Sequence, residues 1–138
     1  MRLLLDSDIL LDIALDRASF VESSEAILKL CQHRRHLGIL AWHTIANVYY
    51  LLRKTEGDAT TRVFLRDLIE FCAVARGSAD AVRQALELKM NDFEDALQVS
   101  AGLAEASQFI ITRNTKHYRR SPLPPLTPQQ FLTRFHSR

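Results

Sequence analysis

The stretch Leu3-Leu-Leu-Asp6-Ser-Asp8, close to the start of the chain, decides the fold. Three consecutive leucines followed by an acidic turn predict a short buried strand that ends at Asp6. The apolar segment Ile9–Ala14 then predicts a short helix directly after the strand. The run Phe109–Thr112 has the same apolar character and is the clearest strand of the chain. Because helices separate the strands, we expect right-handed crossovers and an α/β fold with a mainly parallel sheet that is covered on both faces.

The rest of the chain continues this alternation of short apolar runs and longer amphipathic segments. Two further strands are predicted over Leu37–Ala41 and Phe71–Ala75. Helices are predicted over Ser19–His33, His43–Lys54, 59–70, Ser78–Lys89 and Asn91–Ala106, and a last one is predicted to begin at Pro128. We expect one domain over residues 1–138, because this length is close to the commonest size of a single domain.

Local sequence also predicts where some of these elements begin and end. Ser19 and Glu22 have the spacing of a capping box at the start of the second helix. Gly57 is expected to end a helix, and Asp58 is expected to cap the next one. The proline-rich segment Ser121–Pro128 is predicted to be a loop, because proline removes backbone donors.

The composition is typical of a soluble globular protein, with 47% hydrophobic and 25% charged residues. It excludes disordered, collagen-like and disulfide-scaffold proteins. Cys31 and Cys72 are too few for a disulfide framework and are compatible with a reducing cytosol, so a cytoplasmic location is expected. No apolar run approaches the roughly 18 residues of a membrane span, and we expect no association with a membrane.

The net charge of +2 is unevenly distributed along the chain. The first 105 residues carry 12 basic and 16 acidic side chains, whereas the last 33 carry six basic side chains and no acidic one. This basic C-terminal segment favours a polyanionic partner. Four of its residues are candidates for contacts with RNA phosphates: Arg113, Lys116, Arg119 and Arg120.

Acidic side chains are concentrated where strands end or helices begin. Asp6 and Asp8 follow the first strand, and Asp92, Glu94 and Asp95 begin the helix that precedes the strand at 109–112. In parallel sheets ligands bind at the carboxyl ends of the strands. Carboxylates without matching basic side chains would repel one another unless a cation neutralises them, and oxygen ligands suit Mg²⁺ or Mn²⁺. The alternative is purely structural, because Asp favours helix N-caps and acids in a first turn complement the helix dipole.

Four segments resemble, in the same order along the chain, motifs of the PIN domain family. They are Leu3–Asp12, Asp92–Gln98, Phe109–Tyr118 and Pro124–Leu132. The resemblance implies a three-layer α/β/α domain with a central, mainly parallel sheet. It also implies a Mg²⁺- or Mn²⁺-dependent endoribonuclease. Many members of the family are toxins of VapBC-type toxin–antitoxin pairs, commonly homodimeric and silenced by a cognate antitoxin protein.

The motifs carry the family's site residues onto particular positions of this chain. Asp6 matches the first metal-binding acid, Asp95 matches the third, and Asn114 occupies the common Asp/Asn site, so the resemblance implies that these three residues are catalytic. Asn47 stands where the family normally has the glutamate of its second motif. His117 replaces an acid that is often found near the end of the fourth motif.

The departures from the pattern leave two functions open. Asp8, where the family usually has asparagine, and Asp92 are added to Asp6 and Asp95 as candidate metal ligands. With these ligands the chain is expected to cleave RNA. Without the glutamate replaced by Asn47, the alternative is a degenerate PIN domain that binds RNA or a protein partner without cleaving.

Overall fold

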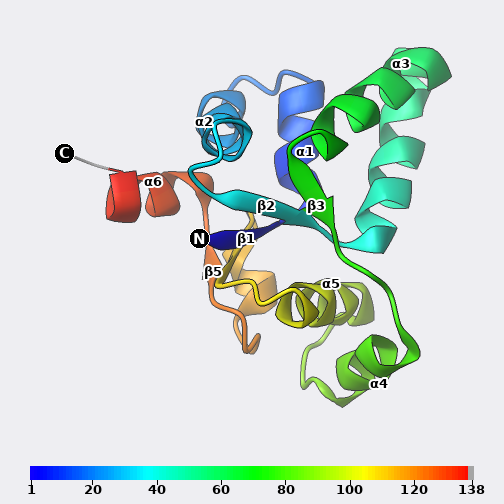
Figure 1. The fold of residues 1–138 in the computed structure, drawn as a ribbon, viewed down its shortest axis with the longest axis vertical. Helices are drawn as coiled ribbons and strands as arrows, with labels where there is room; N and C mark the ends of the chain where they lie inside the picture. Colours follow the sequence, from blue (N-terminus) through cyan, green and yellow to red (C-terminus); the bar gives the residue numbers. More distant parts are fainter. Residues whose placement is uncertain (137–138) are drawn as a thin grey trace.

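The computed structural model describes residues 1–136, so the predicted domain end and Arg138 of the basic C-terminal segment lie outside the described residues. Its centre is a five-stranded sheet in the order β3-β2-β1-β4-β5, and every neighbouring pair is parallel. The strands are β1 (Arg2–Leu5), β2 (Leu37–Leu40), β3 (Cys72–Val74), β4 (Phe109–Ile111) and β5 (Pro125–Leu126). The predicted parallel sheet is confirmed, and the bounds of its four predicted strands, β1 to β4, agree to within one residue (Figure 1).

Helices cover both faces of the sheet and complete the three-layer α/β/α arrangement that the sequence predicts. The helices are α1 (Ser7–Ala14), α2 (Val21–Gln32), α3 (Trp42–Ile69), α4 (Ala79–Glu87), α5 (Phe93–Ala104), a 3₁₀ turn η1 (Thr115–Tyr118) and α6 (Pro128–His136). Figure 1 shows α1, α2 and α3 on one face of the sheet and α4 and α5 on the other. Within the described residues, no helix has both the length and the apolar composition required to span a membrane.

The alternating side chains of β1 separate two hydrophobic cores. Leu3 and Leu5 are buried against α1, α2, α3 and α6, and Leu4 is buried against α5 on the opposite face. Gly102 allows α5 to approach β1 closely, since a Cβ atom at this position would lie 2.8 Å from Leu4 Cδ2. This close packing determines how the first turn of α5, with its acidic residues, lies relative to the end of β1.

Four helix starts have side-chain caps, and the first is α1, where Asp6 accepts a hydrogen bond from the backbone of Ser7. Ser78 accepts a hydrogen bond from the backbone of Ala81 at the start of α4, and Asp92 caps α5. At α6, Thr127 and Gln130 form a reciprocal capping box before the first-turn proline Pro128.

Three local predictions are wrong. No side chain caps α2, whose N-cap is Phe20, because the chain turns at 18–20 and leaves Ser19 outside the helix. Asp58 hydrogen-bonds the side chains of Tyr49 and Arg62 rather than capping a helix. The helix end expected at Gly57 is confirmed, because Gly57 is non-helical with φ 81° and divides α3 into two helices at a kink. The segment predicted as a loop contains β5, which pairs with the free edge of β4.

Candidate functional site

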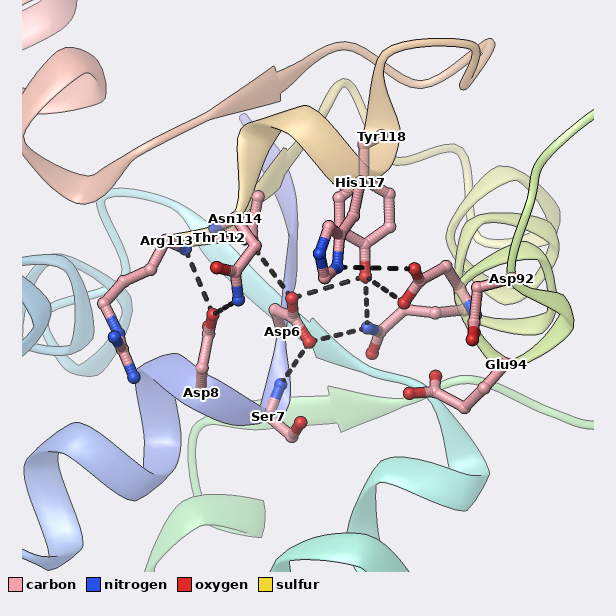
Figure 2. Close-up of polar contacts among 12 residues, drawn as sticks. Asp6, Ser7, Asp8, Asp92, Glu94, Thr112, Arg113, Asn114, His117 and Tyr118 are labelled. Atoms are coloured by element: carbon pink, nitrogen blue, oxygen red, sulfur yellow. Dashed lines mark hydrogen bonds and ion pairs between the residues drawn. The ribbon is translucent and has the colours of Figure 1, made fainter.

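The candidate site lies at the carboxyl edge of the sheet, where the ends of β1 and β4 meet the first turn of α5. Asp6 directly follows β1, and its backbone N–H donates to the carbonyl of Ile111 at the end of β4 over 3.0 Å. Thr112 directly follows β4, and Asp92 precedes α5. Figure 2 shows Asp6 between Asp8 and Asn114 on one side and Tyr118 on the other. The fold therefore joins segments that are about a hundred residues apart in the sequence.

The carboxylate of Asp6 is only 8% exposed and accepts four hydrogen bonds. Its Oδ1 accepts from the backbone of Ser7 and from Gln98 Nε2, each at 2.8 Å. Its Oδ2 accepts from Thr112 Oγ1 at 2.7 Å and from the Tyr118 hydroxyl at 3.3 Å. A carboxylate offers about four lone-pair positions, so these donors hold Asp6 in one orientation.

The Tyr118 hydroxyl connects Asp6 to Asp95, the two acids for which the sequence argument is strongest. It lies 3.3 Å from Asp6 Oδ2 and 3.2 Å from Asp95 Oδ1. Gln98 Nε2 donates to the same hydroxyl at 3.1 Å. Thr44, in the first turn of α3, donates to Gln98 Oε1 at 2.8 Å and so turns the amide nitrogen toward Asp6 and Tyr118. The structure therefore places Asp6 and Asp95 around one hydroxyl group.

Asp8 lies beside this network with one oxygen satisfied and one unpartnered. Its Oδ2 accepts from Asn114 Nδ2 at 3.0 Å and from the backbone of Arg113 at 3.2 Å (Figure 2). Its Oδ1 is buried and has no hydrogen-bond partner among the described residues. Burial, and next the carboxylate of Asp6, raises the pKa of Asp8 to about 7. The environment thus favours a proton or a cation at this side chain.

The acidic residues at the start of α5 have two different roles: one caps the helix and one belongs to the site. Asp92 Oδ1 accepts the backbone N–H of Asp95 at 2.9 Å, so the structural role that we considered for Asp92 is present. Asp95 points to Tyr118 instead, and burial together with the charges of Asp92 and Glu94 raises its pKa to about 6. Asp95 therefore resembles Asp8 in carrying a negative charge that its surroundings disfavour.

Two histidines flank these acids. His43 Nε2 lies 3.0 Å from Glu94 Oε2, and His117 Nδ1 lies 3.7 Å from Asp95 Oδ2. Glu94 is thus paired at the rim of the site rather than directed to Asp6.

Arg113 is tied to α1 on the other side of Asp8. Its Nε lies 2.7 Å from Oδ2 of the fully buried Asp12, an ion-pair distance without hydrogen-bond geometry. The other oxygen of Asp12, Oδ1, accepts a hydrogen bond from Arg17 at 3.1 Å, and the guanidinium of Arg113 lies 4.1 Å from the ring centre of Phe20. The other phosphate candidates, Lys116, Arg119 and Arg120, are exposed on and just after η1.

Asn47 is a predicted site position that the structure does not join to the network. Its side chain is half-buried in α3, and no hydrogen bond among the described residues links it to Asp6 or Asp95. The contribution of α3 comes instead from Thr44.

Four residues of the network were not identified as functional from the sequence: Thr44, Gln98, Thr112 and Tyr118. A signal for Gln98 was present, because it lies three residues after Asp95 and so shares its helix face. Thr44 and Tyr118 carry no comparable signal, since only the packing of α3 and η1 against α5 brings them to Gln98.

The donor set fits a magnesium or manganese ion, although only in part. Within residues 1–136, no three His, Cys, Asp or Glu side chains converge closely enough to hold a metal together. Magnesium, however, keeps several waters and is commonly bound by one or two carboxylates. Asp6 and Asp95 supply such a pair, and the unpartnered buried oxygen of Asp8 has the chemistry of a further ligand. All three of these side chains would offer oxygen atoms to a cation.

Comparisons with known proteins agree with this geometry. A family model described as a PIN domain matches residues 2–116. Among solved structures, VapBC2 from Rickettsia felis, crystallised with promoter DNA, matches with a TM-score of 0.73 at 18% identity over 92% of this chain and 98% of that one. VapBC-1 from nontypeable Haemophilus influenzae gives a TM-score of 0.68 at 15% identity, over 94% and 99% of the two chains.

A third solved structure, VapC20 from Mycobacterium tuberculosis, is described as a toxin that cleaves the sarcin–ricin loop. It matches with a TM-score of 0.61 at 12% identity, over 78% of this chain and 86% of that one. No curated protein is similar enough in sequence to be identified as a relative. Identities this low establish the fold, and the family model, which covers most of the sequence, establishes the kinship: the chain belongs to the PIN domain family.

Proposed function

We propose that this chain is a Mg²⁺- or Mn²⁺-dependent endoribonuclease and the toxin of a VapBC-type toxin–antitoxin pair. The observation that carries the proposal is the meeting of Asp6 and Asp95 at one hydroxyl group, although 88 residues separate them in the chain. A structural cap at either position would not require the two carboxylates to converge. The proposal treats residues 1–138 as one domain.

In this proposal Asp6 and Asp95 hold the cation, and Asp8 adds its unpartnered oxygen. Asp92, the remaining candidate ligand, is the weakest of the four because its Oδ1 is already engaged as a cap. When bound, such a cation activates water and offsets the charge that develops on a phosphodiester. Asn114 keeps Asp8 oriented by donating to Oδ2, so its role in the proposed site is to position a carboxylate.

RNA is the substrate class that the chain's charge distribution favours. The acidic pocket alone would repel phosphates. Three exposed basic side chains lie on η1, the element that supplies Tyr118, or directly after it: Lys116, Arg119 and Arg120. Cleavage of the sarcin–ricin loop by the structurally similar VapC20 supports RNA as the substrate. Arg113 has a weaker claim to phosphate contact, because it is already paired with Asp12.

We propose two protein partners: a cognate antitoxin and a second copy of the chain. The similarity to structures of VapBC pairs supports the antitoxin. For the second copy, Trp42, Tyr50 and Ile69 are large apolar side chains that α3 leaves exposed. The Tyr50→Arg variant should shift the purified protein from dimer to monomer in sedimentation equilibrium, and a wild-type monomer would exclude the homodimer.

The test of the catalytic proposal is cleavage of single-stranded RNA in Mn²⁺. Wild-type protein should cleave, and Asp6→Asn and Asp95→Asn should each abolish cleavage while remaining folded by circular dichroism. Asp67→Asn is the matched control, because Asp67 is an exposed aspartate on the far part of α3. Cleavage that persists in both site variants would exclude this site.

The second candidate function is binding of RNA or a protein partner without cleavage. It is favoured by the four hydrogen bonds that already satisfy Asp6, and by Asn47 in place of a carboxylate. Binding of RNA that is unchanged in a chelator, without any cleavage in Mn²⁺, would support this second function against the first.

A further inference from the structure

The position of the Tyr118 hydroxyl is determined by the packing of its ring. Tyr118 is 1% exposed, and its ring lies in the core between the sheet and α5 with Leu4, Val99, Ile110 and Leu123. Close packing of this kind leaves a large aromatic side chain no alternative rotamer. The hydroxyl therefore cannot swing away from Asp6 and Asp95 without disturbing the core.

The two amide hydrogens of Gln98 and the proton of Tyr118 are all engaged around this hydroxyl. Gln98 accepts from Thr44 and spends both amide hydrogens, one on Asp6 and one on Tyr118. The hydroxyl, having accepted from Gln98, has a single proton for two carboxylates, Asp6 at 3.3 Å and Asp95 at 3.2 Å. Neutral donors thus stand where two anionic side chains approach each other.

These contacts conflict with those that a cation would make. A metal ion held by Asp6 and Asp95 needs lone pairs of the same two carboxylates, and in this structure the single Tyr118 proton is shared between one oxygen of each. A hydrogen bond to a charged group is among the stronger ones in proteins, so giving it up opposes metal binding.

Building on the proposed function, we propose that the Tyr118 hydroxyl, oriented by Gln98, competes with the divalent cation for Asp6 and Asp95 and so lowers the metal affinity of the site. In the absence of metal the hydroxyl keeps the two carboxylates hydrogen-bonded. Metal binding is weakened because the ion must displace hydrogen bonds that the two carboxylates already accept from the protein. Tyr118 therefore raises the concentration of divalent cation that is needed to occupy the site, and it does so without contacting the substrate.

The variant Tyr118→Phe tests this directly, because it removes the hydroxyl and keeps the buried ring. We expect Mn²⁺ to bind roughly tenfold more tightly in isothermal titration calorimetry, a change equivalent to about 1.4 kcal/mol. Added Mn²⁺ should also raise the unfolding temperature of Tyr118→Phe by more than that of wild-type protein. The matched control is Tyr49→Phe, since the Tyr49 hydroxyl also donates to a carboxylate, that of Asp58, but away from the site. This control should bind Mn²⁺ as the wild type does.

The outcomes separate this inference from the function on which it rests. Equal Mn²⁺ affinity in wild type and Tyr118→Phe, lost in Asp6→Asn, would overturn the competition and leave the metal site intact. Weaker binding by Tyr118→Phe would also overturn it, since the hydroxyl would then be helping to hold the ion. Absence of Mn²⁺ binding in both proteins, together with absence of RNA cleavage, would overturn both the competition and the proposed nuclease.

Discussion

Thr112 Oγ1 donates a 2.7 Å hydrogen bond to Asp6 Oδ2 across 106 residues of sequence. The same hydroxyl oxygen accepts from the backbone of Asn114 at 3.0 Å. Both side chains are buried, and they lie at the ends of the neighbouring strands β1 and β4. Thr112 therefore orients Asp6 and also shapes the turn that carries Asn114 toward Asp8.

Replacing Thr112 with valine should destabilise the fold by about 1–3 kcal/mol, the usual cost of leaving a buried polar partner unsatisfied. Valine has nearly the shape of threonine, so the change removes the hydrogen bonds without creating a cavity. Urea unfolding in a chelator measures the effect. Thr112→Ser, which keeps the hydroxyl, should recover most of the loss. Equal stability of the valine variant and wild type would contradict the importance of this contact.

The buried ion pair of Arg113 with Asp12 leads to a second prediction. Arg113→Met should lower the free energy of unfolding by about 2–4 kcal/mol, because it leaves the fully buried carboxylate of Asp12 with Arg17 alone. In contrast, the exposed pair of Arg62 with Asp58 should contribute little, and Arg62→Met should cost less than about 0.5 kcal/mol. If the two variants lose similar amounts of unfolding free energy, the pair of Arg113 with Asp12 contributes no more to stability than an exposed ion pair.

The raised pKa of Asp8 predicts a pH dependence of stability. An unfolded aspartate titrates near its ordinary value of 3.8, whereas the folded protein keeps the Asp8 proton up to a pKa of about 7. Between these values the native state binds more protons than the unfolded state, so stability should fall as the pH rises from about 4 to about 7. Asp95, whose pKa is raised to about 6, acts in the same direction.

Asp8→Asn should remove the Asp8 part of this dependence. Its amide oxygen can accept the two hydrogen bonds that Asp8 Oδ2 accepts from Arg113 and Asn114. We expect the variant to be about 1–2 kcal/mol more stable than wild type at pH 8 and equal to it near pH 4, in urea titrations without divalent metal. If the difference in unfolding free energy between Asp8→Asn and wild type is the same at pH 4 and pH 8, Asp8 does not titrate in this range. Asp67→Asn, at an exposed position, is the control.

Local patterns were sufficient to predict four of the five strands and the gathering of acidic residues at strand ends and helix starts. The apolar runs that became β1 and β4 each end at a polar residue, and parallel strands place such ends at one edge. This rule placed Asp6 and Asp95 near one edge but left open whether they cap helices or bind a metal, and the resemblance to PIN domain motifs singled them out as metal ligands. The capping roles of Ser78 and Asp92 follow equally from short-range sequence.

The connections between these elements could not be predicted in the same way. Tyr118 reaches Asp6 because its ring fills a core formed by residues of six other segments, and nothing local to η1 encodes that. Gln98 on a buried helix face could be read as an ordinary core polar residue until Thr44 and Asp6 are known to be its partners. The pairing of Arg113 with Asp12 likewise depends on how α1 lies beside the end of β4.

The basic residues around η1 give the last prediction, which concerns affinity for RNA. Replacing Lys116, Arg119 and Arg120 together with glutamine should weaken binding of single-stranded RNA in a chelator. Each phosphate contact contributes about −0.7 to the slope of log affinity against log salt for single strands, so losing three should make this slope shallower by about 2. The matched control replaces Lys29, Arg34 and Arg35, which lie at the end of α2 and before β2, at the opposite edge of the sheet. This control changes the net charge by the same amount and should leave the slope unchanged. Equal slopes for the two triple variants would show that the effect comes from overall charge and that η1 does not contact the phosphates.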